Sequence, residues 1–124
     1  MKEPSENQIQ SAFFSWCAIN EKKYPELSLC FAVPNGSHKS PAARSLFKAT
    51  GLKPGVPDVC LPVRGVIDAK AYIGLFLEFK SKKGVLSDSQ RVWIDALQNA
   101  GHYVAVVRDW VTAANVVSQY LGLK

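Results

Sequence analysis

Two carboxylates and one lysine in this sequence have the types and spacing needed for chemistry on a charged group. Asp58 precedes the apolar run Val-Cys-Leu, and the triplet Glu78-Phe79-Lys80 ends the apolar run Leu-Phe-Leu. Because side chains alternate across a β-strand, Glu78 and Lys80 are expected on the same face. A carboxylate and an ammonium group are costly to bury without partners, so this face either opens to solvent or holds something charged. A divalent metal would pair with the carboxylate, and a phosphate beside it would pair with the ammonium group.

The donor atoms in this set favour a hard metal ion. Asp58, at the start of an adjacent strand, adds a second carboxylate, and two carboxylates with a backbone oxygen and water suit Mg²⁺ or Mn²⁺. The alternative is a plain surface ion pair between Glu78 and Lys80, which is the commoner meaning of an isolated Glu-x-Lys triplet. The Pro-Asp pair, a glutamate on the first helix and a glutamine at the start of the helix after the triplet favour the metal site.

The elements that position these residues can be read from hydrophobic spacing and from proline and glycine positions. Helices are expected at residues 5–19, 41–50, 87–100 and 110–121, the first starting near Ser5 or Glu3. Strands are expected at 29–33, 58–61, 74–80 and 103–107, with 74–80 central. Residues 63–73 lack a clear period and are interpreted as a hairpin turn or loop. The order αβαββαβα predicts an α/β fold with a small mixed sheet flanked by helices.

Length and composition limit the class of protein. With 124 residues and a hydrophobic fraction of 48%, one domain spanning residues 1–124 is expected. No apolar run is long enough to span a membrane, and the polar N-terminus is unlike a signal peptide, so a cytoplasmic protein is expected. The formal net charge of +5 favours a polyanionic partner such as DNA.

Several segments together resemble a known family. They are GLKPGVPD at 51–58, LFLEFKSKKGVLSDSQ at 75–90 and GHYVAVVR at 101–108, with the opening SENQIQ helix and the VPNG turn at 33–36. This pattern resembles the VRR-NUC branch of the PD-(D/E)xK nuclease superfamily, of the stand-alone type found in phages and bacteria. The resemblance covers nearly the whole chain.

The resemblance implies a restriction-endonuclease-like core and phosphodiester hydrolysis carried by Asp58, Glu78 and Lys80. It implies Mg²⁺ or Mn²⁺ held by Asp58, Glu78 and the backbone carbonyl of Phe79. Such a metal would polarise the scissile phosphate and make a bound water more acidic. Lys80 would orient that water or stabilise charge that develops on the phosphate oxygens.

Two further polar residues join the candidate site through the resemblance. Similar nucleases use a glutamate of the first helix at the metal, and Glu6 is the candidate for that role. Glu3 competes with it, but Glu3 precedes Pro4 and is expected to lie before the helix. Gln90, in the first turn of its helix, is expected to position Lys80 or a phosphate. Without the resemblance, it would be interpreted as a solvated helix residue.

A set of basic and polar residues could contact DNA phosphates, which fix position without reading sequence. Each of these residues taken singly is more often a solvated surface group, and the asparagine among them could instead only supply the tight turn. The set consists of Asn35, His38, Lys39, Arg44, Lys82 and Lys83.

The expected function is therefore a metal-dependent DNA endonuclease. The resemblance implies a homodimer that acts on branched DNA such as a Holliday junction. A second hypothesis is a nicking or restriction-like nuclease of ordinary duplex DNA. A third, from a different class, is a DNA-binding module with little activity of its own.

Overall fold

The computed structural model of the chain describes residues 2–34 and 40–124. The elements in chain order are α1 (Glu6–Asn20), a 3₁₀ helix η1 (Pro25–Leu29), β1 (Phe31–Ala32), α2 (Pro41–Ala49), β2 (Val59–Leu61), β3 (Gly65–Ile67), β4 (Lys70–Tyr72), β5 (Leu75–Phe79), α3 (Asp88–Asn99), β6 (Tyr103–Val107) and α4 (Trp110–Leu121). None of the helices in this part of the chain has the length and apolar character needed to cross a membrane.

Four of the strands form one mixed sheet in the order β1-β2-β5-β6. The pairs β1/β2 and β2/β5 are antiparallel, whereas β5 and β6 are parallel because α3 connects them as a crossover. The strand β5 is therefore flanked by a strand on each side. The expected α/β fold with a small mixed sheet flanked by helices is confirmed.

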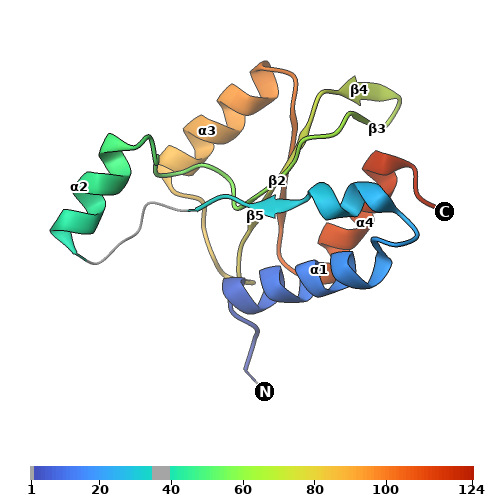
Figure 1. Cartoon of the computed structure of the whole chain (residues 1–124), viewed down its shortest axis with the longest axis horizontal. Helices are drawn as coiled ribbons and strands as arrows, with labels where there is room; N and C mark the ends of the chain where they lie inside the picture. The colour runs from blue at the N-terminus through green and yellow to red at the C-terminus, as the bar shows by residue number, and fades with distance from the viewer. Residues whose placement is uncertain (1, 35–39) are drawn as a thin grey trace.

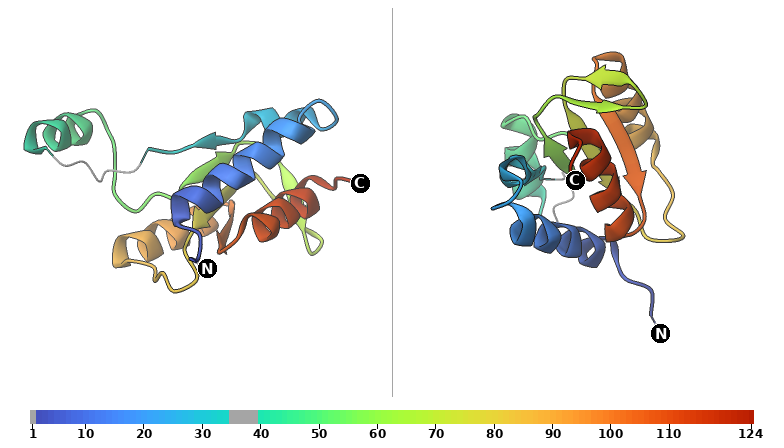
Figure 2. Two further views of the ribbon diagram at one scale, coloured as in Figure 1. Left: turned by 90° about the horizontal axis from the view of Figure 1, so that it is seen from below. Right: turned by 90° about the vertical axis from the view of Figure 1, so that its right-hand side faces the viewer.

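Helices cover both faces of this sheet. The helices α1 and α4 pack together on one face, and α3 lies against the other face beside β6 (Figures 1 and 2). The first of these faces carries the core, where the ring of Phe13 on α1 lies 5.7 Å from the ring of Phe79 on β5. Both rings are fully buried. Phe79 thus anchors the end of β5, between the two charged residues of the triplet.

The structure differs from the expected elements at one place and decides between two alternatives at another. The expected strand at 29–33 is only Phe31–Ala32, because Pro25 starts a 3₁₀ helix that buries Leu27 and extends to Leu29. Residues 63–73 adopt the hairpin alternative as strands β3 and β4. This hairpin packs on α4, where a Cβ on Gly65 would lie 2.4 Å from ring carbons of Tyr120.

Candidate active site

Asp58 and Glu78 lie side by side because of the register between β2 and β5. The antiparallel ladder pairs Val59 with Leu77, so the next residues along the two strands, Asp58 and Glu78, face each other. Asp58 Oδ2 accepts a hydrogen bond of 2.7 Å from the Phe79 backbone N–H. This bond satisfies the Phe79 N–H, a backbone donor of β5 that lies beyond the end of its partner strand β2. It also fixes the Asp58 carboxylate beside Glu78.

Glu78 is the most unusual polar group of the structure. Its side chain is only 1% exposed, and its Oε1 is buried without a hydrogen-bond partner among the described residues. Burial raises the pKa of the Glu78 carboxyl to about 9, helped by a hydrogen bond with Asp58 and by the charges of Asp58 and Glu6, while Lys80 acts in the opposite direction. The positive charge of Lys80 therefore only partly offsets the burial and the acidic neighbours of Glu78.

Lys80 is held just beyond the end of β5. Its backbone N–H donates to Val107 O at 3.0 Å, continuing the pairing with β6, and its side chain is 7% exposed. The following loop passes close to it, since a Cβ on Gly84 would lie 3.3 Å from Lys80 Cδ and 3.4 Å from Glu6 Oε2. Gly84 thus lies against the aliphatic part of Lys80 and the carboxylate of Glu6. The start of α1 therefore lies next to Lys80.

The two glutamates near the first helix have different surroundings. Glu6 is the first residue of α1, whose start is held by a capping box between Ser5 and Gln8. Glu3 lies before the helix, is exposed, and pairs with Lys82 at 3.9 Å. Of the two candidates, the structure brings Glu6 to the site.

Gln90 is hydrogen-bonded to Ser87, whereas its expected partner is Lys80 or a phosphate. Its side-chain oxygen accepts from the Ser87 N–H at 2.8 Å, and Ser87 Oγ accepts from the Gln90 N–H at 3.2 Å. These two bonds form a capping box that fixes the first turn of α3. Among the described residues, no hydrogen bond joins Gln90 to Lys80.

Arg108, which follows β6, is a further residue of the site region and has no role predicted from the sequence. Its Nη1 donates to three carbonyl oxygens of the loop after Lys80: Ser81 at 2.7 Å, Gly84 at 2.8 Å and Lys82 at 3.3 Å. One guanidinium group therefore holds the loop that passes Lys80 and Glu6. The only available signal was the place of Arg108 at the end of a strand, because its partners depend on the β5/β6 pairing.

The residues expected to contact phosphates are dispersed. Lys82 and Lys83 are exposed in the loop after Lys80, and Arg44 is exposed on α2. Asn35, His38 and Lys39 lie outside the described residues. Lys82 and Lys83 are thus two and three residues from Lys80 along the chain, and Lys82 pairs with Glu3.

The donor set fits a divalent metal. The orphaned Glu78 oxygen and the adjacent Asp58 carboxylate form an acidic pair whose mutual repulsion a cation would remove. Within the described ranges, no three Asp, Glu, His or Cys side chains converge as a metal-binding cluster. A metal at this site would therefore rest on Asp58 and Glu78, with backbone or water oxygens completing its shell.

We predict that Glu78→Gln stabilises the metal-free protein at alkaline pH. Glu78 has a folded pKa above its unfolded value, so its contribution to stability is complete below about pH 4.5 and is lost as the pH rises through about 9. Glutamine cannot ionise and avoids this loss. Urea unfolding in EDTA should show a gain of about 2 kcal/mol at about pH 8 and little gain at about pH 5.

The exposed Glu26→Gln variant is the control for this measurement, because it removes an acid that is not buried. Its free energy of unfolding should follow the wild-type pH profile. A Glu78→Gln gain that is the same at both pH values would contradict the stated cause, since the benefit would then not come from ionisation.

Comparison with known proteins agrees with this geometry. Residues 4–110 match the family model of the VRR-NUC domain. A solved structure described as a VRR_NUC domain protein superposes with a TM-score of 0.74 at 26% sequence identity, covering 99% of this chain and 93% of that chain. Among curated proteins, none matches the sequence. On the strength of the family match, the chain belongs to the VRR-NUC family, whose members are nucleases of the PD-(D/E)xK type.

Proposed function

We propose that this chain is a divalent-metal-dependent endonuclease that hydrolyses phosphodiester bonds in DNA. The family supplies the reaction class, a nuclease. The observation that supports these particular residues is the buried pair of Glu78 and Lys80 with the half-buried Asp58 at one end of the sheet, where Glu78 Oε1 has no hydrogen-bond partner among the described residues. A charged set of this kind, kept in a folded core at a cost in stability, is typical of an active site.

Asp58 and Glu78 would hold the metal, Mg²⁺ or Mn²⁺, with the Phe79 carbonyl as a third oxygen. Glu6 would reach the same metal through a water, because among the described residues it does not converge with Asp58 and Glu78 as a third direct ligand. When bound, the metal would supply Lewis-acid polarisation of the phosphate and a more acidic water. The protein's own contribution is to hold these oxygens in place before the substrate arrives, through the Phe79 N–H bond to Asp58.

Lys80 would act on the charge that develops during hydrolysis. A buried ammonium group interacts more strongly with an anion than an exposed one, because the surroundings have a low dielectric constant. It would orient the attacking water or stabilise the phosphate oxygens as the bond to the leaving oxygen breaks. Gln90 would contribute by fixing the first turn of α3, and Lys82 and Lys83 would contact neighbouring phosphates.

We further propose that the substrate is branched DNA, such as a Holliday junction, and that the enzyme acts as a homodimer. Resolution of a junction needs two symmetric cuts, and a two-fold dimer presents two sites with matching symmetry. The alternatives are a nicking or restriction-like nuclease of duplex DNA and a DNA-binding module with little activity. A DNA substrate also agrees with the expected place of action, the cytoplasm of a bacterium or phage-infected cell.

Asp58→Asn should abolish metal-dependent cleavage while leaving the fold intact. The asparagine oxygen can still accept the Phe79 N–H, but the negative charge that would hold the metal is lost. We expect a loss of at least about 10³-fold in cleavage rate of labelled junction, flap and duplex DNA with Mg²⁺ or Mn²⁺. The exposed Asp95→Asn variant on α3 should cleave like the wild type. Unchanged cleavage by a folded Asp58→Asn protein would remove Asp58 from the site.

Arg108→Ala should lower turnover more than DNA affinity. The loop from Ser81 to Gly84 would lose three hydrogen bonds, and with them the packing of Gly84 against Lys80 and Glu6. Small misplacements of such groups cost about 10–100-fold in rate. Single-turnover cleavage in Mg²⁺ and gel-shift binding in Ca²⁺ measure the two effects separately.

A positioning role for Arg108 predicts that Arg108→Lys recovers part of the rate, because an ammonium group can still donate to loop carbonyls. The exposed Lys22→Ala variant, which removes a positive charge after α1, should keep the wild-type rate. Equal losses of rate and affinity, with no recovery by lysine, would instead make Arg108 an ordinary phosphate contact.

The assembly proposal predicts a dimer by light scattering and paired cuts in a four-way junction. Each strand is labelled in turn, so that symmetric cleavage in opposite strands can be seen directly. Preference for the junction over linear duplex should persist as salt weakens both, because it depends on shape rather than on charge alone. A monomer that nicks linear duplex as readily as the junction supports the duplex nuclease, and binding without cleavage supports the DNA-binding module.

A further inference from the structure

The net positive charge of this chain is concentrated in one segment, because that segment has no acidic residue. Between Leu27 and Pro57 the sequence contains no Asp or Glu, but it contains the basic residues Lys39, Arg44, Lys48 and Lys53. The rest of the chain has the other eleven Lys and Arg against all ten Asp and Glu, so this segment supplies four of the five net charges. A segment that carries several cations and no acid is typical of a surface that contacts nucleic acid.

The described part of this segment stands away from the body of the protein. We call residues 40–54, which comprise α2 and the loop after it, the basic arm. The helix α2 lies at the outer end of the molecule, apart from the other helices (Figures 1 and 2). None of its nine residues is buried, and Leu46 is 61% exposed. A helix with no buried residue contributes little to the core, so the core alone does not account for its presence.

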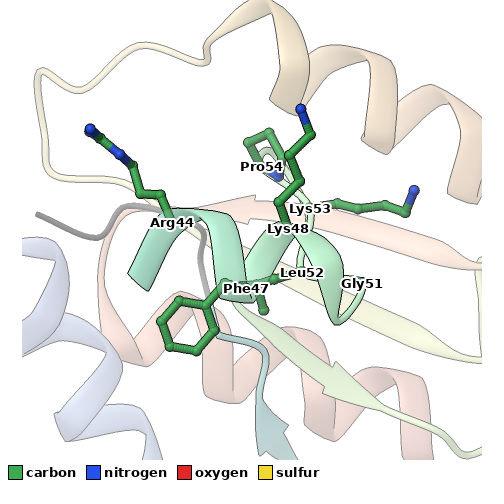
Figure 3. Close-up of a pocket in the computed structure, with 7 residues that line it drawn as sticks. All are labelled: Arg44, Phe47, Lys48, Gly51, Leu52, Lys53 and Pro54. Carbon is green, nitrogen blue, oxygen red and sulfur yellow. The ribbon is translucent and has the colours of Figure 1, made fainter. Parts of the chain in front are cut away.

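The basic arm has a shaped surface rather than scattered charges. Seven residues line a cavity of about 540 Å³ between α2 and its loop: Arg44, Phe47, Lys48, Gly51, Leu52, Lys53 and Pro54. Figure 3 shows Arg44 and Lys48 extending from the same side of the helix, one turn apart. Among the described residues, none of the three cations in this set pairs with an acid. The charges are therefore available to an external anion.

The basic arm is fixed relative to the candidate active site by the segment that joins them. The loop folds back on α2 through the Leu52 N–H bond to Phe47 O at 2.8 Å. Gly55 then packs against the start of α3, where a Cβ would lie 2.7 Å from backbone atoms of Ser89, and its φ of +92° requires glycine. Three residues later the chain reaches Asp58. The arm thus extends from the site on a segment with little freedom.

We infer that the basic arm binds the sugar–phosphate backbone of the DNA that flanks the scissile bond. This inference rests on the proposed function. Arg44 and Lys48 would contact phosphates, Lys53 would add a third contact, and the apolar floor of Leu52 and Pro54 suits the deoxyribose edge. Such contacts fix the position of the duplex without reading its sequence.

A second copy of this chain is the competing occupant, and charge disfavours it. A two-fold interface through this face would place the same patch of each copy against the other. Arg44, Lys48 and Lys53 would then face their own counterparts, with no acid between residues 27 and 57 to compensate them. Like charges across an interface cost several kcal/mol, whereas a phosphate backbone complements them.

The test is the double variant Arg44→Gln/Lys48→Gln, measured by fluorescence anisotropy with labelled duplex and junction DNA in EDTA. Loss of two phosphate contacts should reduce the slope of log Kd against log salt by about two and weaken binding at physiological salt by about tenfold or more. The matched control is Lys22→Gln/Lys23→Gln, which removes the same charge after the end of α1, far from α2 (Figure 1). The control should keep the wild-type slope.

Three results would overturn the inference. They are an unchanged slope in the Arg44/Lys48 variant, an equal change in the control, or a changed dimer dissociation constant with unchanged DNA affinity, which would assign the face to a second copy. Circular dichroism verifies that both variants are folded. Binding is measured without metal, so it is independent of cleavage. A wild-type protein that binds DNA through the basic arm but never cleaves it refutes only the proposed nuclease activity. A protein that cleaves DNA but whose binding is unchanged in the Arg44/Lys48 variant refutes only this inference.

Discussion

The register between β2 and β5 is the constraint on which the candidate site depends. Pairing of Val59 with Leu77 sets Asp58 opposite Glu78, and the Asp58 carboxylate then takes the Phe79 N–H beyond the end of the strand. A slip of one residue would send Asp58 to the other face of the sheet and separate the two carboxylates. The buried residues Val59, Leu77 and Phe79 prevent that slip, because it would expose them. The core and the site are thus specified by the same side chains.

Burial of this site costs stability, and the cost indicates what the site is for. Glu78 is buried, its Oε1 has no hydrogen-bond partner among the described residues, and it lies beside a second carboxylate and a lysine that only partly compensates them. A hydrophobic residue there would give a more stable protein. The charged set is instead supported from several sides: α1 brings Glu6, Arg108 holds the adjacent loop, and Gly84 leaves room for Lys80. This combination is typical of preorganised catalytic groups.

The molecule separates the candidate site from the surface that we propose contacts the DNA. The end of the sheet holds the groups proposed to act on the phosphate, while α2 carries cations and has no fully buried residue. The join at Gly55 and Ser89 keeps these two parts in a set relation, because neither a Cβ nor a usual φ is available at that position. Substitutions on α2 would then change how the DNA is positioned, and substitutions at the end of the sheet would change the chemistry.

The sequence by itself determined the helices, the central strand, the family and the set Asp58, Glu78 and Lys80. Hydrophobic periodicity and residue types are local properties, and a short motif is visible without any knowledge of distance. The capping partner of Gln90 is Ser87, three residues away, so that contact was a local signal in the sequence as well. The tertiary structure decided that Glu6 lies near Lys80 while Glu3 pairs with Lys82, and it set the loop contacts of Arg108. It also decided that Glu78 is buried and that α2 is not. Each of these depends on which strands pair and which elements pack together, and such long-range contacts have no signature in the spacing of residues along the chain.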